Sequence, residues 1–353
     1  MNPQHDTDSG TVVWSVSDAN PRNGEGDVLE LPDGMLFLAY TRFDSGGDDA
    51  PAVIRGAFSD DGGRNWRDEH TVQANIGRCN VMCANLLTLQ DGRVALVFNV
   101  KNGQVVGDLD CRPYIIYSDD NCATWSEPQA ICTDVGRYYV LENSRLVQLS
   151  SSRIVVPLAL GVATEPWWFA ACCAYSDDGG ATWRMSEFAA AMDRQRTGMV
   201  ETGVVELSPE RRQVRGASAA SPPLLMYGRS CYGQILHCLS TNGGLTWSTP
   251  EPLGPQSPIS PSLIKRLSTG DLVLVWNAQD RRQALPEWRA PLTAAISRDE
   301  GQTWGNVHDI ESDISTTYCY PSLTSTSKDT VILTYYRGSE MVLRVLDVDW
   351  FYR

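Results

Sequence analysis

The sequence contains no apolar stretch long enough to span a membrane, and its N-terminus has no basic segment followed by an apolar one. It is also poor in positive charge, since 29 Lys and Arg stand against 43 Asp and Glu and give a formal net charge of -14. Nucleic acids and anionic membranes bind proteins through a cationic surface. We therefore expect neither as a partner, and we expect a cytoplasmic protein.

Histidine is scarce and the cysteines follow no metal-binding pattern. There are four His residues, and ten Cys residues are dispersed over the 353 positions. Cys79 and Cys83 have no second pair at the spacing of a zinc site. The adjacent Cys172 and Cys173 lie in an apolar run and are expected to be buried, reduced thiols. We expect no metal and no cofactor.

What the chain does contain is a repeated octapeptide. Its five copies are SDDGGRNW (Ser59–Trp66), SDDNCATW (Ser118–Trp125), SDDGGATW (Ser176–Trp183), STNGGLTW (Ser240–Trp247) and SRDEGQTW (Ser297–Trp304). Successive copies start 59, 58, 64 and 57 residues apart. A period of this length, carried by strands, is typical of a β-propeller blade of about four strands. Within each copy the Asp can accept backbone N–H groups, and the Trp can pack between neighbouring sheets.

The segments around the copies read as strands and hairpins. The first unit shows GDVLEL, the turn PDG, MLFLAYTRF and then AVIRGAF before Ser59. A sixth unit without the octapeptide is visible in YPSLTSTSKDTVILTYYRG and MVLRVLDVDW, and TVVWSV at Thr11–Val16 can add its missing outer strand. The sequence predicts an all-β, six-bladed propeller that forms one domain over residues 1–353.

The octapeptide resembles the Asp-box, or BNR repeat, and the chain resembles the sialidase (neuraminidase) superfamily over nearly its whole length. This resemblance implies an exo-glycosidase that hydrolyses a terminal acidic sugar, sialic acid or a related one. It also implies a Tyr nucleophile assisted by a Glu, an Asp acid/base and three Arg that hold the substrate carboxylate. A phenol beside a carboxylate can lose its proton without presenting a formal anion to an anionic sugar, and Arg binds a carboxylate in bidentate fashion.

Each of these positions has a candidate in the chain. The run YCYPSL resembles the strand that carries the nucleophile and gives Tyr320, and MVETGVVEL gives Glu201 as its partner. LLMYGRSCYG supplies Arg229, and EWRAPLTAAISRDEGQTW supplies Arg289, as two of the carboxylate-binding arginines.

The first repeat departs from the family pattern. The loop RFDSGGDDAPAV matches the acid/base loop, with Asp48 best placed and Asp49 next. We expect Asp49, and Arg42 at the start of the loop, to contact the substrate. The Arg-Ile-Pro that opens the first strand in the family is absent, and NPRNGEGDVLEL stands there with Arg22 two residues early and Glu25 inside the expected pocket.

Further polar residues fall at the inner end of the third repeat. VLENSRLVQL places Asn143 and Arg145 there, where they can contact sugar hydroxyls or an acid group, or simply solvate the axis.

Two other functions fit the same pattern. A carbohydrate-binding propeller without catalysis would use Trp167, Trp168, Trp276 and Trp288 as stacking surfaces. A different glycosidase or a sugar lyase would use a Tyr or a His such as His237 for proton transfer.

Overall fold

Strands make up nearly all regular structure in the protein. The computed structural model describes residues 11–353 apart from 106, 163–167, 190–197, 219–220 and 279–287. In these residues the strands are accompanied by a single 3-10 helix, η1 (Val348–Tyr352). None of the described helical structure is long and apolar enough to cross a membrane. The predicted all-β class is confirmed, although the end of MVLRVLDVDW enters η1 and does not continue the predicted strand.

Four sheets are four-stranded antiparallel meanders. The first contains β2 (Arg22–Glu30), β3 (Leu36–Phe43), β4 (Ala52–Ser59) and β5 (Arg67–Gln73). The second contains β15 (Val200–Glu206), β16 (Leu224–Arg229), β17 (Gln234–Ser240) and β18 (Glu251–Gln256). The third contains β19 (Leu263–Arg266), β20 (Leu272–Asn277), β21 (Leu292–Ser297) and β22 (Gly305–Glu311). The fourth contains β23 (Tyr318–Ser325), β24 (Thr330–Arg337), β25 (Glu340–Asp347) and β1 (Thr11–Trp14).

The remaining nine strands form one sheet that holds two successive meanders. The first meander comprises β6 (Asn80–Thr88), β7 (Val94–Val105), β8 (Asp108–Ser118) and β9 (Gln129–Ala130). The second comprises β10 (Tyr138–Val140), β11 (Val147–Gln148), β12 (Ile154–Val162), β13 (Trp168–Ser176) and β14 (Arg184–Met185). A parallel bridge between Tyr138 of β10 and Cys111 of β8 joins them.

The first strand of the chain pairs with the last one. β1 runs antiparallel to β25, with Thr11 opposite Leu343 and Val12 opposite Val342. The pairing predicted for TVVWSV is therefore present, although the strand ends two residues earlier, at Trp14. It covers the edge of β25, which would otherwise expose unpaired backbone groups.

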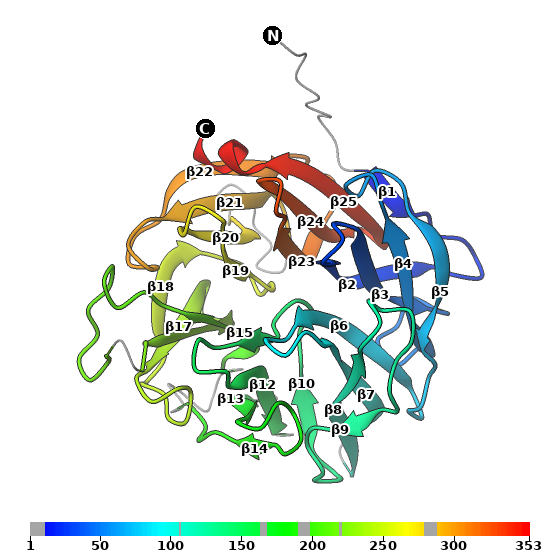
Figure 1. Cartoon of the computed structure of the whole chain (residues 1–353), viewed down its shortest axis with the longest axis horizontal. Coiled ribbons are helices and arrows are strands. Elements are labelled where there is room, and N and C mark those ends of the chain that lie inside the picture. The colour runs from blue at the N-terminus through cyan, green and yellow to red at the C-terminus, as the bar shows by residue number, and fades with distance from the viewer. Residues whose placement is uncertain (1–10, 106, 163–167, 190–197, 219–220, 279–287) are drawn as a thin grey trace.

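Hydrophobic clusters join each meander to its neighbours. Figure 1 shows the sheets arranged around a centre, with β2, β6, β15, β19 and β23 innermost. One cluster packs Phe37 and Ile54 of the first meander against Phe98 of the second, and others join the later meanders in turn. A further cluster packs Ile332 of the last meander against Leu38 of the first. The described sheets therefore pack in a circular series.

The octapeptides form the turns between the third and fourth strands of their meanders. In the third copy Asp178 accepts the backbone N–H of Thr182 at 2.8 Å, and the buried Ser176 Oγ accepts the N–H of Gly180 at 2.8 Å. Gly180 adopts a φ of 91°, which glycine tolerates better than other residues. Trp183 packs against the cluster between the second and third meanders. The predicted structural roles of the octapeptide are confirmed.

We predict that Ser176→Ala destabilises the protein by about 1–3 kcal/mol, because the buried N–H of Gly180 loses its acceptor. Urea unfolding measures the change in the free energy of unfolding. The control is Ser151→Ala, at an exposed position, which should change stability by no more than about 0.5 kcal/mol. Equal effects of the two substitutions would contradict the structural role of Ser176.

Candidate active site

Four inner strands carry the same backbone irregularity. In β2, β6, β15 and β23 the pairing register shifts by one residue, as in a β-bulge. The bulged residues have positive φ: 49° at Glu25, 65° at Cys83, 52° at Glu201 and 55° at Tyr320. A residue with a side chain adopts this conformation at a cost. All four side chains line one cavity.

The cavity has a volume of about 190 Å³ and is rich in charged groups. The charged residues among its described lining are Glu25, Asp48, Lys101, Glu142, Glu201 and Arg229. Four carboxyl groups thus surround the space that the sequence assigns to an acidic sugar.

Tyr320, Glu201 and Arg229 lie in contact in this cavity. The Tyr320 hydroxyl lies 3.5 Å from Glu201 Oε1, and the same oxygen accepts Arg229 Nη1 at 2.7 Å. Glu201 Oε2 and Arg229 Nε are buried and have no hydrogen-bond partner among the described residues. Among the described residues, Glu201 Oε2 is therefore an available acceptor and Arg229 Nε an available donor beside the tyrosine.

Burial and the carboxylates of Glu201 and Glu142 raise the pKa of Tyr320 well above its usual value. The guanidinium groups of Arg289 and Arg229 oppose this shift. Tyr320 is therefore a neutral phenol in the resting protein, and it can act as a nucleophile only if its proton is removed during the reaction.

Arg289 lies against the other side of the tyrosine. Its guanidinium carbon is 5.6 Å from the centre of the Tyr320 ring, and its backbone carbonyl accepts the N–H of Tyr318. Burial acts to lower the pKa of Arg289, but nearby acidic groups, Glu201 among them, outweigh it, so that the pKa is raised. The two arginines are close enough for the positive charge of Arg289 to oppose that of Arg229. Of the five residues proposed for the reaction, Tyr320, Glu201, Arg229 and Asp48 line the cavity, whereas Arg289 packs against Tyr320 and is not among the described lining residues.

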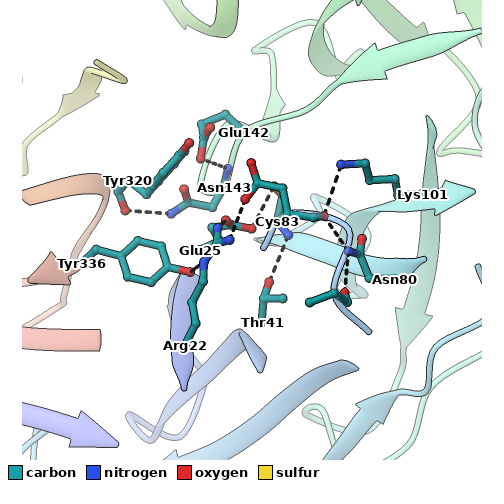
Figure 2. A network of polar contacts seen from close by, with 12 residues as sticks. Arg22, Glu25, Thr41, Asn80, Cys83, Lys101, Glu142, Asn143, Tyr320 and Tyr336 are labelled. Atoms are coloured by element: carbon teal, nitrogen blue, oxygen red, sulfur yellow. Dashed lines mark hydrogen bonds and ion pairs between the residues drawn. The ribbon is translucent and has the colours of Figure 1, made fainter. Parts of the chain in front are cut away.

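Arg22 reaches the edge of the cavity in spite of its early position in the sequence. Its three nitrogens bind Tyr336 Oη at 3.0 Å, Asp48 Oδ1 at 2.6 Å and Glu25 Oε1 at 2.5 Å, and Figure 2 shows the contacts with Glu25 and Tyr336. Its guanidinium also lies over the Phe43 ring at 4.1 Å. Arg22 is therefore enclosed by groups of the protein.

Glu25 is buried between Arg22 and the cavity. Cys83 Sγ donates to Glu25 Oε2 at 3.4 Å. Burial raises the pKa of Glu25, and Arg22 partly offsets the shift. Burial and the nearby Glu25 and Glu142 raise the pKa of the Cys83 thiol well above its usual range.

The loop of Asp48 is tied to the second meander. Asn80, labelled in Figure 2, donates through Nδ2 to the backbone carbonyls of Asp48 and Ala50, each at 2.9 Å. Lys101 Nζ lies 2.8 Å from Asp49 Oδ1. The Asp48 side chain is 65% exposed at the cavity rim, whereas Asp49 binds Lys101 and does not line the cavity.

Glu142 is a cavity residue that the sequence reasoning missed. Its side chain is buried, and one of its oxygens accepts the N–H of Asn143 at 2.9 Å. Burial and the negative charge of Glu201 raise its pKa well above the usual value. The signal was available, since a Glu beside Asn143 at the inner end of a strand is as costly to bury as Glu201.

Asn143 and Arg145 point into the protein. Asn143 Nδ2 donates to the carbonyls of Gly26 and Tyr320, and Arg145 Nη2 donates to the carbonyl of Ser262 at 2.6 Å. Neither is among the described residues that line the cavity. Both side chains are buried, and these hydrogen bonds join the inner strands. That they contact a sugar stays a prediction.

Arg42 also lies away from the cavity lining. It sits on β3 within electrostatic range of Tyr40 and Glu69, on the face opposite the buried Thr41. Strand alternation explains this, since successive side chains point to opposite faces.

The residues of the two alternative functions lie elsewhere. Trp168, Trp276 and Trp288 pack against hydrophobic clusters, and Trp167 lies outside the described residues. His237 contacts the carbonyl of Glu251 on the outer strands. In the described part of the chain no group of three His, Cys, Asp or Glu residues could hold a metal ion. All ten cysteines are free, and Cys172 and Cys173 are buried as expected.

Comparisons with known proteins agree with this architecture. The model of the BNR repeat-like domain family matches residues 48–333. No curated protein matches the chain.

Several solved structures share the fold. A protein of unknown function from Dyadobacter fermentans is 17% identical, with 95% of this chain and 97% of that chain covered and a TM-score of 0.75. The Hadza microbial sialidase Hz136 is 17% identical, with coverages of 97% and 69% and a TM-score of 0.75. The intramolecular trans-sialidase from Ruminococcus gnavus is 15% identical, with coverages of 96% and 97% and a TM-score of 0.74. At these identities the similarity shows a sialidase-like fold.

The raised pKa of Cys83 generates a chemical prediction. Because the thiolate is the reactive form, iodoacetamide at pH 8 should modify the half-buried Cys231 well before Cys83. Peptide mass spectrometry of the folded protein measures both rates, and labelling in urea, where all cysteines should react, is the control. Equal rates in the folded protein would show that Cys83 is not shielded.

Proposed function

We propose that the protein is a retaining exo-glycosidase for a terminal acidic sugar, sialic acid or a related one. The chain belongs to the BNR repeat-like family, within the sialidase/BNR-repeat superfamily. The six meanders would be the six blades of one propeller domain. The observation that carries the proposal is the contact of Tyr320 with Glu201, and of Glu201 with Arg229, in a cavity that also includes Asp48.

In the first step the Tyr320 oxygen attacks the anomeric carbon while its proton passes to Glu201. Glu201 suits this role because its Oε2 is a buried acceptor without a partner among the described residues. The bond to the leaving oxygen breaks, and Asp48 gives that oxygen a proton. In the second step Asp48 takes a proton from water, water attacks the anomeric carbon, and the proton on Glu201 returns to Tyr320.

Asp48 must be released from Arg22 and take up a proton from solvent before it can serve as the acid in the first turnover; in later turnovers the proton that it takes from water in the second step serves. In the resting structure Arg22 Nη1 holds its Oδ1 at 2.6 Å. Asp48 is the exposed member of this ion pair, at 65% against 12% for Arg22, so its side chain can turn toward a bound substrate. Productive binding would therefore include a local rearrangement at the rim.

The acid group of the sugar is assigned to Arg229 and Arg289. Arg229 Nε is a buried donor without a partner among the described residues, and a carboxylate supplies the acceptor that such a donor requires. The volume of about 190 Å³ lies below the roughly 300–1,000 Å³ of pockets for drug-sized ligands, which favours a single sugar ring over a long chain.

Replacement of Arg229 or Arg289 by Lys should weaken binding of the acidic sugar by about 1.5–3 kcal/mol, because the planar fork of donors is lost although the charge remains. Calorimetric titration with the sugar measures the affinity. The control is Arg184→Lys on the outer strand β14, where the side chain is exposed. Unchanged affinity in both the Arg229 and the Arg289 variant would place the acid group elsewhere.

The decisive test of catalysis is Tyr320→Phe, which deletes one oxygen. The variant should fold and bind the sugar, yet its kcat on an aryl glycoside of the acidic sugar should fall by roughly three orders of magnitude or more, because the nucleophile is gone. Tyr318→Phe is the matched control, since Tyr318 lies on the same strand in the hydrophobic core and should keep its activity. Turnover near the wild-type rate in Tyr320→Phe would rule out the mechanism.

A further inference from the structure

The position of Glu25 separates Arg22 from the cavity. Glu25 and Asp48 line the cavity, whereas Arg22 is not among the described lining residues. The Glu25 side chain is 1% exposed and the Arg22 side chain 12% exposed, and the two are joined by a 2.5 Å contact, drawn in Figure 2. A ligand in the cavity therefore meets the carboxyl groups that bind Arg22 before it meets the guanidinium.

Most of the donors of Arg22 are taken up by the protein. Each of its three nitrogens binds a protein oxygen, which uses three of its five N–H groups, and an aromatic ring covers its face. Arg229 differs, because only its Nη1 is bound to Glu201 and its Nε lacks a partner among the described residues. A substrate carboxylate that approached Arg22 would have to displace Glu25. Glu25 is buried and lies at the bulge of β2, with a φ of 49°.

The second partner of Glu25 fixes it in this position. Cys83 Sγ donates to Glu25 Oε2 while Arg22 binds Oε1, so both carboxyl oxygens are held from two neighbouring meanders. Glu25 and Cys83 each lie at the bulge of their strand. Glu25 is thus a rigid part of the cavity wall.

We propose that Glu25 is a specificity-determining residue that withdraws Arg22 from substrate binding and lowers the affinity of the cavity for anionic sugars. The proposal deepens the proposed function, on which it rests. Under this proposal the substrates are sugars whose single acid group is held by Arg229 and Arg289. Where the family has its third carboxylate-binding arginine, Glu25 offers an acceptor that suits a sugar hydroxyl.

The test compares one sugar with and without its charge. The probes are 2-deoxy-2,3-didehydro-N-acetylneuraminic acid and its methyl ester, and calorimetry gives the ratio of their affinities. In Glu25→Gln this acid-to-ester ratio should rise on the order of tenfold, because a negative charge leaves the cavity wall and Arg22 can turn its donors inward. Glu340→Gln, which removes the same charge from a partly exposed pair with Arg337, should leave the ratio unchanged.

A double variant identifies the source of the gain. In Glu25→Gln with Arg22→Gln the ratio should return to near the wild-type value, because the released guanidinium is absent. A gain that persists without Arg22 would overturn the proposal. Glu25→Asn provides a second neutral variant if Glu25→Gln does not fold, because Asn tolerates positive φ better than most residues.

The outcomes separate this proposal from the proposed function. An unchanged ratio in folded Glu25→Gln or Glu25→Asn, or no binding of either probe to them, overturns the role of Glu25. Binding of the acid to the variant but not to the wild type supports that role, while it counts against an acidic sugar as the natural substrate.

Discussion

The candidate site depends on one backbone constraint, the bulge with a left-handed residue at the inner end of β2, β6, β15 and β23. In a regular strand successive side chains point to opposite faces of the sheet, where they would enter the clusters between the meanders. The bulge interrupts this alternation and directs Glu25, Cys83, Glu201 and Tyr320 into one cavity. Such a conformation costs of order 1–3 kcal/mol per residue, and the packed strands on both sides supply the stability that offsets it.

Because of this arrangement, the residues that pack the sheets together are separate from the residues that line the cavity. The octapeptides form the turns after the third strands, and the hydrogen bonds of residues such as Ser176 and Asp178 stay within each turn. The cavity is formed by the inner ends of the strands and by the loop of Asp48. Substitutions in the cavity can therefore change the substrate while the clusters between the meanders stay intact, which is why the fold alone does not define the sugar.

The sequence predicted the elements that local chemistry determines. The repeat period and the octapeptides defined the meanders, and the motifs around Tyr320, Glu201 and Arg229 defined residues that lie together. It did not show that Arg42 lies away from the cavity lining, because the face that a side chain occupies depends on strand register. Glu142 was missed although a Glu at the inner end of a strand is costly to bury; what the sequence could not show is its proximity to Glu201, which lies on another meander.

The protonation of the carboxyl groups in the cavity determines how strongly the cavity repels an acidic ligand. Burial raises the pKa of both Glu25 and Glu142, and mutual repulsion with Glu201 adds to the shift at Glu142. A group with a raised pKa keeps its proton to higher pH, so Glu142 is protonated over a range in which an exposed glutamate is charged. A protonated Glu142 removes one negative charge from the cavity and supplies an O–H donor. The same acidic wall can therefore accept a carboxylate beside Arg229 and Arg289 without the large repulsion that four ionised carboxylates would produce.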